Sequence, residues 1–141
     1  MNDNNIRLEI DARSENVALA RVIATAFMTP LDPTVGEISD VKTAISEAVT
    51  NAIIHGYDEK PGVVCISLAS NGRKITIEIA DIGVGIESIE NAREPLFTTK
   101  PEMERSGLGF TVMESFMDEV RVKSTPGAGT TITMVKTLRT Q

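Results

Sequence analysis

The sequence has no tryptophan, one cysteine and one histidine, and its other aromatic residues are one tyrosine and four phenylalanines. The single cysteine, Cys65, excludes a disulfide within the chain. Because it lies in an alternating apolar run, we expect a buried, unreactive thiol rather than a nucleophile. A chain of 141 residues needs neither a disulfide nor a structural metal, since it buries about two-thirds of the surface that its unfolded form exposes.

Positive charge is in deficit, with 14 Lys and Arg residues against 20 Asp and Glu residues and a net charge of −6. Such a surface repels phosphates, which argues against direct binding of nucleic acid. No apolar run approaches the roughly 20 residues that span a bilayer, and the first residues lack the regions of a secretory signal. We therefore expect a cytoplasmic protein without a membrane segment.

The apolar pattern predicts a mixture of strands and helices. Strands are expected over about 6–11, 64–68, 75–79, 120–122 and 132–134, and helices over about 14–28, 34–55 and 107–118. Ser14 is the expected N-cap of the first helix, Gly56 the left-handed end of the second, and Asn71-Gly72 the turn of a hairpin. This order predicts an α+β fold, a single domain over 1–141. In it, a mixed, mostly antiparallel sheet forms a two-layer sandwich with three helices on one face.

Regular periodicity is lost over about 82–106, apart from a short helix expected near 86–93. Segments of that length without regular structure are uncommon in compact domains and often serve as lids over active sites. Glycines stand on both sides of this segment, in Asp81-Ile82-Gly83-Val84-Gly85 and in Gly107-Leu108-Gly109. We expect a lid with glycine-rich hinges.

Asp81 has the same parity as Ile75, Ile77 and Ile79, so a regular strand directs its carboxylate toward the interior. A buried carboxylate requires a hydrogen bond or a charge partner. Two interpretations are open: Asp81 accepts a hydrogen bond from an exocyclic amine such as that of adenine, or it caps the turn that ends the strand.

The second helix places Glu47, Asn51 and His55 on one stripe, beside an apolar face that includes the small residues Ala48 and Ala52. Asparagine is unfavourable inside a helix, and its carbonyl oxygen suits Mg²⁺, so Asn51 is the candidate metal ligand. Glu47, one turn earlier, is the candidate general base, and the alternative is a solvated helix residue. For His55 we expect a hydrogen bond at the helix end.

The third helix begins at Gly107-Leu108-Gly109, where backbone N–H groups and the helix dipole favour an anion, which predicts a phosphate site. The lysine-bearing loop of P-loop proteins is missing from the sequence. Any nucleotide site is therefore of another kind.

Four motifs occur in a meaningful order: Glu47…Asn51, Asp81-x-Gly83-x-Gly85, Gly107-x-Gly109 and Gly127-x-Gly129-Thr130-Thr131. They resemble the N, G1, G2 and G3 boxes of the GHKL (Bergerat) superfamily, which includes gyrase B, MutL and the ATPase domains of histidine kinases. Within it, the runs ARSEN at 12–16, SEAVTNAIIHGY at 46–57 and PLFTTK at 95–100 are similar to the anti-sigma-F factors of endospore-forming bacteria.

This resemblance implies an ATP-dependent serine kinase that holds sigma factor F inactive, phosphorylates an anti-anti-sigma factor and forms a homodimer. The implied cofactors are ATP or ADP and Mg²⁺, with Glu47 as general base, Asn51 as Mg²⁺ ligand and Asp81 on the adenine amine. The other residues that it assigns to the nucleotide are Gly83, Gly85, Thr98, Thr99, Lys100, Arg105, Ser106, Gly107, Leu108, Gly109 and Thr130.

Arg21 is the candidate partner-binding residue, on a predicted helix that is otherwise apolar apart from Thr25. The resemblance places this arginine in contact with both the sigma factor and the anti-anti-sigma factor. The alternative is a surface arginine that snorkels or pairs with a nearby acid such as Glu15.

Three other interpretations of function stay open. A histidine-kinase catalytic domain needs a phosphoacceptor histidine upstream, whereas the only histidine, His55, lies within the N box. A nucleotide-gated binding module would bind ATP without chemistry. A switch kinase of the stress-response type would act on another sigma factor.

Overall fold

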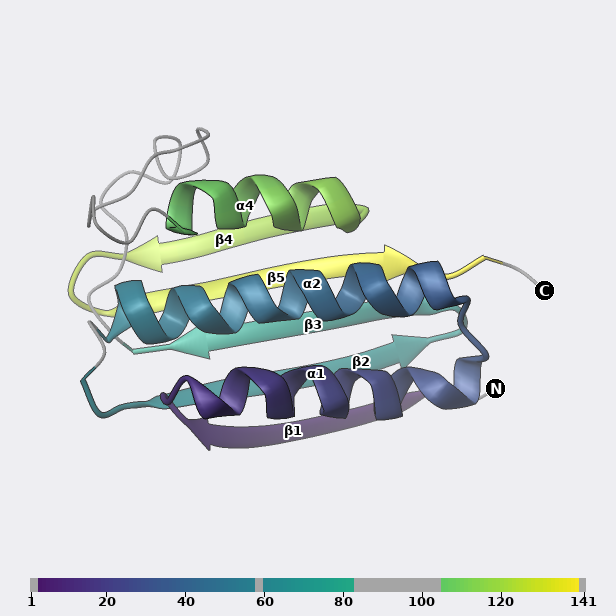
Figure 1. The fold of residues 1–141 in the computed structure, drawn as a ribbon, viewed down its shortest axis with the longest axis horizontal. Helices are drawn as coiled ribbons and strands as arrows, with labels where there is room; N and C mark the ends of the chain where they lie inside the picture. The colour runs from purple at the N-terminus through teal and green to yellow at the C-terminus, as the bar shows by residue number, and fades with distance from the viewer. Residues whose placement is uncertain (1–2, 58–59, 83–104, 140–141) are drawn as a thin grey trace.

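The computed structural model describes residues 3–57, 60–82 and 105–139, which form a sheet covered by helices (Figure 1). The strands are β1 (Asn4–Asp11), β2 (Val63–Asn71), β3 (Lys74–Asp81), β4 (Glu119–Thr125) and β5 (Gly129–Thr137). They form a five-stranded sheet in the order β1-β2-β3-β5-β4.

Every pairing in this described sheet is antiparallel, which corrects the expectation of a mixed sheet. The strands β3 and β4 do run in the same direction, as strands on either side of a helix often do. They are not neighbours, because β5 folds back from β4 as a hairpin and inserts between them.

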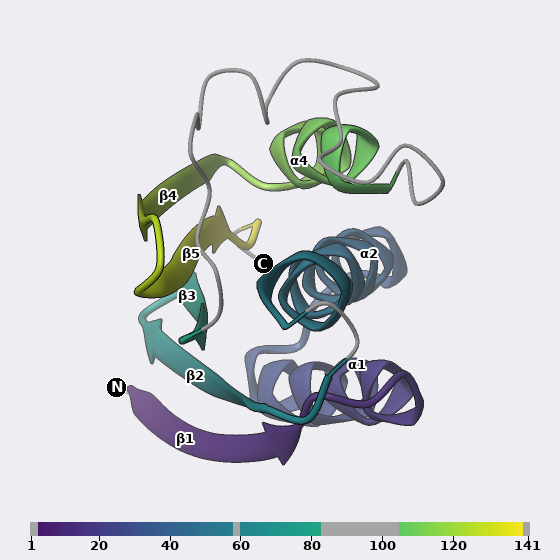
Figure 2. The same cartoon turned by 90° about the vertical axis from the view of Figure 1, so that its left-hand side faces the viewer.

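The helices α1 (Glu15–Met28), α2 (Val35–Asn51) and α4 (Arg105–Phe116) all cover the same face of the sheet (Figure 2). This confirms the two-layer α+β arrangement expected from the sequence. A 3₁₀ turn, η1 (Thr29–Leu31), connects α1 to α2, and a π-helical turn, η2 (Ala52–Gly56), extends α2. Among the described residues, no helix is both long and apolar enough to cross a membrane.

The core lies between the two layers and follows the predicted alternation. In β3, Ile75, Ile77 and Ile79 are buried against the helices, and α2 presents its apolar stripe to them. Each fully buried side chain of this size contributes about 1.5–3 kcal/mol relative to exposure. Cys65 lies on the opposite face of β2 and is half-buried, so the expectation of a buried thiol was wrong.

Two local predictions differ from the structure. Asn71 pairs with Lys74, so the hairpin turn consists of Gly72 and Arg73, and Gly72 has a φ of 61°. A positive φ at the first turn position only is typical of a type II′ turn, which requires glycine there. Ser14 is not a cap in the usual sense, because its backbone is already helical and its side chain makes no capping hydrogen bond.

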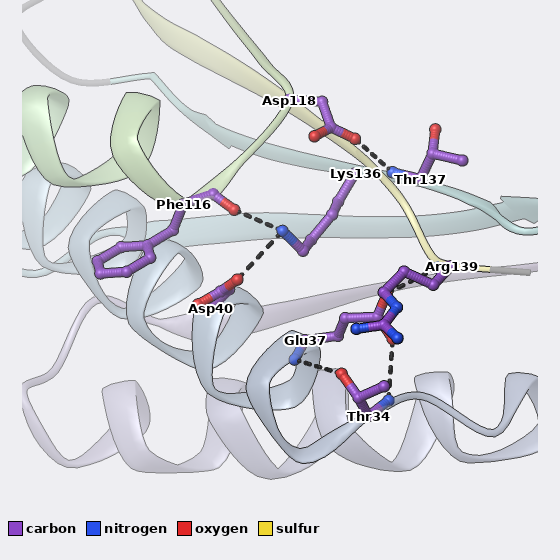
Figure 3. Close-up of polar contacts among 8 residues, drawn as sticks. All are labelled: Thr34, Glu37, Asp40, Phe116, Asp118, Lys136, Thr137 and Arg139. Atoms are coloured by element: carbon purple, nitrogen blue, oxygen red, sulfur yellow. Dashed lines mark hydrogen bonds and ion pairs between the residues drawn. The ribbon is translucent and has the colours of Figure 1, made fainter.

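The N-terminus of α2 is closed by a capping box and joined to the end of the chain (Figure 3). Glu37 Oε1 accepts from the Thr34 N–H at 2.9 Å, and the Thr34 hydroxyl oxygen accepts from the Glu37 N–H at 3.0 Å. Glu37 Oε2 accepts from the Arg139 N–H at 2.7 Å. One buried carboxylate therefore satisfies backbone donors that are far apart in the sequence.

The same end of the molecule also holds the C-terminus of α4 (Figure 3). Lys136 Nζ donates to the Phe116 carbonyl at 2.8 Å and pairs with Asp40 Oδ2 at 3.2 Å. Asp118 Oδ2 accepts from the Thr137 N–H at 2.6 Å. The last strand is thus attached to both α2 and α4, at the end opposite to the site described below.

We predict that Glu37→Gln lowers the free energy of unfolding by about 1–3 kcal/mol, because an amide cannot accept from both backbone donors. Burial raises the pKa of Glu37, but the hydrogen bonds from Thr34 and Arg139 outweigh it and hold the pKa below its ordinary value of 4.5. The contribution is therefore fully present above that value and is lost as the pH falls below it. Urea titrations between pH 7 and pH 3 measure both effects.

The matched control is Glu9→Gln, on an exposed position of β1. It should leave the unfolding midpoint and its pH dependence close to those of the wild type. A Glu37→Gln variant with wild-type stability across this pH range would contradict the role given to the carboxylate.

Candidate functional site

Four elements end or begin at one end of the molecule, where the C-termini of α2 and β3 meet the N-termini of α4 and β5 (Figure 1). Each contributes residues singled out from the sequence. Among those that the structure describes are Asn51, Asp81, Gly109 and Thr130, with Glu47 one turn inside α2. The fold thus brings together motifs that are up to about eighty positions apart in the chain.

Asp81 is the last residue of β3 and is 8% exposed, so its carboxylate points inward as its parity predicted. The carboxylate lies directly against Gly56, where an added Cβ would stand 2.8 Å from Asp81 Cγ. Gly56 does not adopt a positive φ, which corrects the expectation of a left-handed helix end. Its role is to leave room for the carboxylate.

The start of β5 encloses the other side of Asp81. Gly129 has a φ of 108°, and an added Cβ would overlap the Asp81 carbonyl oxygen and lie 2.6 Å from Ile82 Cα. Thr130, 5% exposed, is paired in register with Asp81, and its hydroxyl lies 2.8 Å from Ser124 Oγ. Both glycine conformation and glycine size are therefore needed where β3 and β5 meet.

Tyr57, which was not singled out, positions the backbone that follows Asp81. Its hydroxyl accepts from the Ile82 N–H at 2.9 Å and donates to the Val63 carbonyl at 2.6 Å. The ring packs on Gly62, where a Cβ would stand 2.5 Å from Tyr57 Cδ1. Tyr57 is the only tyrosine of the chain and directly follows Gly56. Its place next to that glycine is the sequence signal that could have pointed to it.

Asn51 is the last residue of α2 proper and is 6% exposed. Directly after it the helix widens, and the Tyr57 N–H donates to the Ala52 carbonyl at 3.0 Å. Single π turns of this kind occur often at functional sites. Among the described residues, no group of three or more His, Cys, Asp or Glu could hold a metal. The amide oxygen of Asn51 fits Mg²⁺, which needs few protein ligands when phosphates and water supply the rest.

Glu47 lies on α2 and reaches the start of α4. An added Cβ on Gly109 would stand 3.3 Å from Glu47 Oε2, so the glycine gives the carboxylate its room. Glu47 is half-buried. The acid of the first motif therefore lies close to the second glycine of the third motif, which their spacing alone did not show.

Arg21 projects from α1 toward α2, where its Nη1 donates to Ser46 Oγ at 3.1 Å. The alternative pairing with Glu15 is wrong, because Glu15 pairs with Arg13 at 2.7 Å. Backbone hydrogen bonding, followed by the Arg13 contact, lowers the pKa of Glu15.

The remaining predicted residues divide into two groups. Gly83, Gly85, Thr98, Thr99 and Lys100 lie outside the described residues, as do the short helix near 86–93 and most of the expected lid. Arg105, Ser106, Gly107 and Leu108 belong to α4, of which the structure describes the backbone at these positions. This helix begins two residues before the expected start at Gly107 and ends at Phe116 rather than near Asp118.

Comparison with known proteins agrees with this geometry. Residues 10–136 match the family described as histidine kinase-like ATPase domain. The chain is 57% identical over 136 residues to the anti-sigma F factor of Clostridium acetobutylicum, covering 96% of this chain and 95% of that protein. It is 55% identical over 133 residues to the anti-sigma F factor of Thermoanaerobacter sp. (strain X514), covering 94% of this chain and 93% of that protein.

A solved structure has a similar fold: the RsbU and RsbW domains of Rv1364c from Mycobacterium tuberculosis, with a TM-score of 0.71 and 21% identity. The match covers 98% of this chain and 33% of the mycobacterial chain. At that identity the likeness concerns the fold.

We predict that Gly56→Ala weakens binding of ATP, because the new methyl group displaces the Asp81 carboxylate. Overpacking of this kind costs about 1–3 kcal/mol. Calorimetric titration with ATP and thermal unfolding measure the two effects. The matched control is Gly36→Ala, in the first turn of α2, where a Cβ would lie 3.9 Å from the nearest side-chain atom. It should bind ATP as the wild type does, and equal ATP affinity of the two variants would contradict the proposed close approach.

Proposed function

This chain belongs to the histidine kinase-like ATPase family and, within it, to the anti-sigma F factors, and we propose that it acts in the cytoplasm as an ATP-dependent serine kinase. In this proposal it sequesters sigma factor F and phosphorylates an anti-anti-sigma factor. The observation that carries the proposal is the arrangement around Asp81 and Glu47. It provides a buried carboxylate, that of Asp81, for the adenine ring and a half-buried one, that of Glu47, beside the start of α4.

Asp81 is the proposed adenine contact. Its carboxylate is buried at the end of β3, and a buried acceptor of this kind selects a ligand that presents a donor. The exocyclic amine of adenine is such a donor, whereas guanine carries a carbonyl at the corresponding position. Gly56 and Gly129 support this role because they leave no side chain between Asp81 and its neighbours. Thr130, opposite Asp81 in the sheet, is proposed to border the same pocket.

The proposed phosphate end of the site is the start of α4. Arg105, Ser106, Gly107, Leu108 and Gly109 are its first five residues. The N–H groups of the first four have no partner within the helix, and the dipole favours an anion there. The phosphate contacts of Thr98, Thr99 and Lys100, and the base-pocket contacts of Gly83 and Gly85, remain proposals from the sequence. Asn51 would hold Mg²⁺, which supplies positive charge to the phosphates when bound.

Glu47 is the proposed general base. It takes the proton of the acceptor serine as the serine oxygen forms a bond to the terminal phosphorus of ATP, while the bond to the ADP oxygen breaks. The products are phosphoserine and ADP. The close approach of Glu47 to Gly109 supports this role, because the carboxylate lies beside the proposed phosphate site.

The second half of the proposal is protein binding, for which Arg21 is the named contact. It is half-buried between α1 and α2 rather than extended into solvent. Arginine is enriched among residues that dominate interfaces because its planar group makes several directed hydrogen bonds. We propose that the sigma factor and the anti-anti-sigma factor both contact Arg21 and so compete for one surface.

We predict that Glu47→Ala binds ATP with nearly wild-type affinity and loses phosphoryl transfer by about 10²- to 10⁴-fold, the usual contribution of a general base. A transfer assay with labelled ATP and the anti-anti-sigma factor, run beside an ATP titration, separates chemistry from binding. Undiminished transfer by the variant would remove Glu47 from this role. A wild type that binds ATP and the sigma factor but transfers no phosphate would favour the nucleotide-gated module without chemistry.

We predict that Arg21→Glu keeps wild-type affinity for ATP, since α1 carries none of the four nucleotide motifs. It should lose binding of both protein partners by about 2 kcal/mol or more. Nucleotide and partner affinities are measured on the same preparation. Arg13→Glu, on an exposed residue just before α1, is the charge-matched control. If the Arg21 variant retains both partners, the shared surface lies elsewhere.

A further inference from the structure

A groove runs along the outer side of α2, next to α1. Its volume is about 380 Å³, and Arg21, Ile38, Lys42, Ser46 and Glu47 are among the residues that line it. Along α2 it reaches from Val35 to Glu47, about 18 Å at 1.5 Å per residue. We call it the α1–α2 groove. Its aliphatic end, at Val35 and Ile38, is distant from the candidate site, and its polar end includes the proposed general base.

Ser46 connects the two walls of this groove. Its hydroxyl donates to the Lys42 carbonyl at 2.6 Å and accepts from Arg21 Nη1 at 3.1 Å. A serine hydroxyl has one proton, which is engaged in the hydrogen bond to the Lys42 carbonyl. Only the lone pairs of the oxygen can therefore face the guanidinium. The backbone of α2 therefore orients the hydroxyl, and the hydroxyl in turn orients Arg21.

This contact leaves most of the arginine available. Nη1 is engaged by Ser46, and within the described residues no carboxylate pairs with the guanidinium. A free arginine side chain carries about 2 kcal/mol of rotamer entropy, part of which is lost before a partner arrives if the group is already held. The Arg21 side chain is therefore preorganised for binding by its hydrogen bond to Ser46.

The charges of the α1–α2 groove indicate what it receives. Arg21 and Lys42 give it two cations against one carboxylate, that of Glu47, in a protein whose net charge is −6. A guanidinium held in one orientation matches the two oxygens of a carboxylate, and charge-assisted pairs of this kind are about twice as strong as neutral hydrogen bonds. An acidic side chain is the complementary ligand.

We infer that Ser46 is a positioning residue, which holds Arg21 in the α1–α2 groove to receive a carboxylate of the bound sigma factor. The inference rests on the proposed function, because it requires that the sigma factor binds through Arg21. It adds Ser46, on α2, to a partner contact for which only Arg21, on α1, was expected from the sequence. Ser46 itself need not touch the partner.

The first test compares three single substitutions by affinity for sigma factor F and for ATP. Ser46→Ala should weaken binding of the sigma factor about 3- to 10-fold, the worth of one hydrogen bond. Ser46→Thr keeps the hydroxyl and should bind within about twofold of the wild type. Ser115→Ala is the control, because Ser115 makes the same type of bond to the Thr111 carbonyl on α4 but, within the part of the chain that the structure describes, accepts no hydrogen bond from an arginine. All three should bind ATP as the wild type does.

The second test distinguishes positioning from a general structural effect. In an Arg21→Ala background, Ser46→Ala should cause no further loss of sigma-factor affinity, because the group that Ser46 orients is gone. The guanidinium N–H protons of Arg21 in the free protein should exchange faster with solvent in Ser46→Ala than in Ser115→Ala.

The outcomes separate the inference from the function on which it rests. Full affinity of Ser46→Ala for the sigma factor, or a loss that persists in the Arg21→Ala background, would overturn the positioning role and leave the proposed function intact. A wild-type protein that does not bind the sigma factor would overturn both.

Discussion

The close packing of backbone around Asp81, its carboxylate on one side and its carbonyl on the other, is the constraint on which the site depends. Gly56 on one side and Gly129 on the other approach so closely that neither position accommodates a Cβ. Ile82, the residue after Asp81, is held by Tyr57, whose hydroxyl accepts a hydrogen bond from the Ile82 N–H. A buried acid is unfavourable unless it is hydrogen-bonded or paired, and here three elements meet around one. The π turn η2, which extends α2, contains Gly56 and so forms the contact with Asp81.

Helix α2 connects the separate parts of the molecule. Its first turn is joined to the end of the chain by Glu37, and its middle carries Ser46 and Glu47 at consecutive positions. Consecutive helical side chains differ by about 100° in direction, so Ser46 reaches α1 while Glu47 reaches α4. The helix ends at Asn51 and continues as the π turn that faces Asp81. The proposed protein binding, chemistry and nucleotide recognition are thus arranged along one helix.

The two ends of α4 are in different surroundings. Its C-terminus is held by Lys136, whose ammonium group donates to the Phe116 carbonyl and complements the negative end of the helix dipole. Its N-terminus borders Glu47 through Gly109, a residue without a side chain. Charged and hydrogen-bonded contacts therefore secure the end remote from the site. The end nearest the proposed phosphates has two glycines, Gly107 and Gly109, and backbone donors.

The sequence by itself determined the elements and most of the candidate residues, because periodicity and glycine placement are local properties. The burial of Asp81 followed from strand parity, and the stripe from Glu47 to Asn51 followed from helical spacing. The tertiary structure decided the antiparallel pairing of every described strand, the reason for glycine at position 56, and the partner of Arg21. Each of these depends on atoms brought together from distant parts of the chain, and a contact such as Arg21 to Ser46 has no signature in the spacing of either residue.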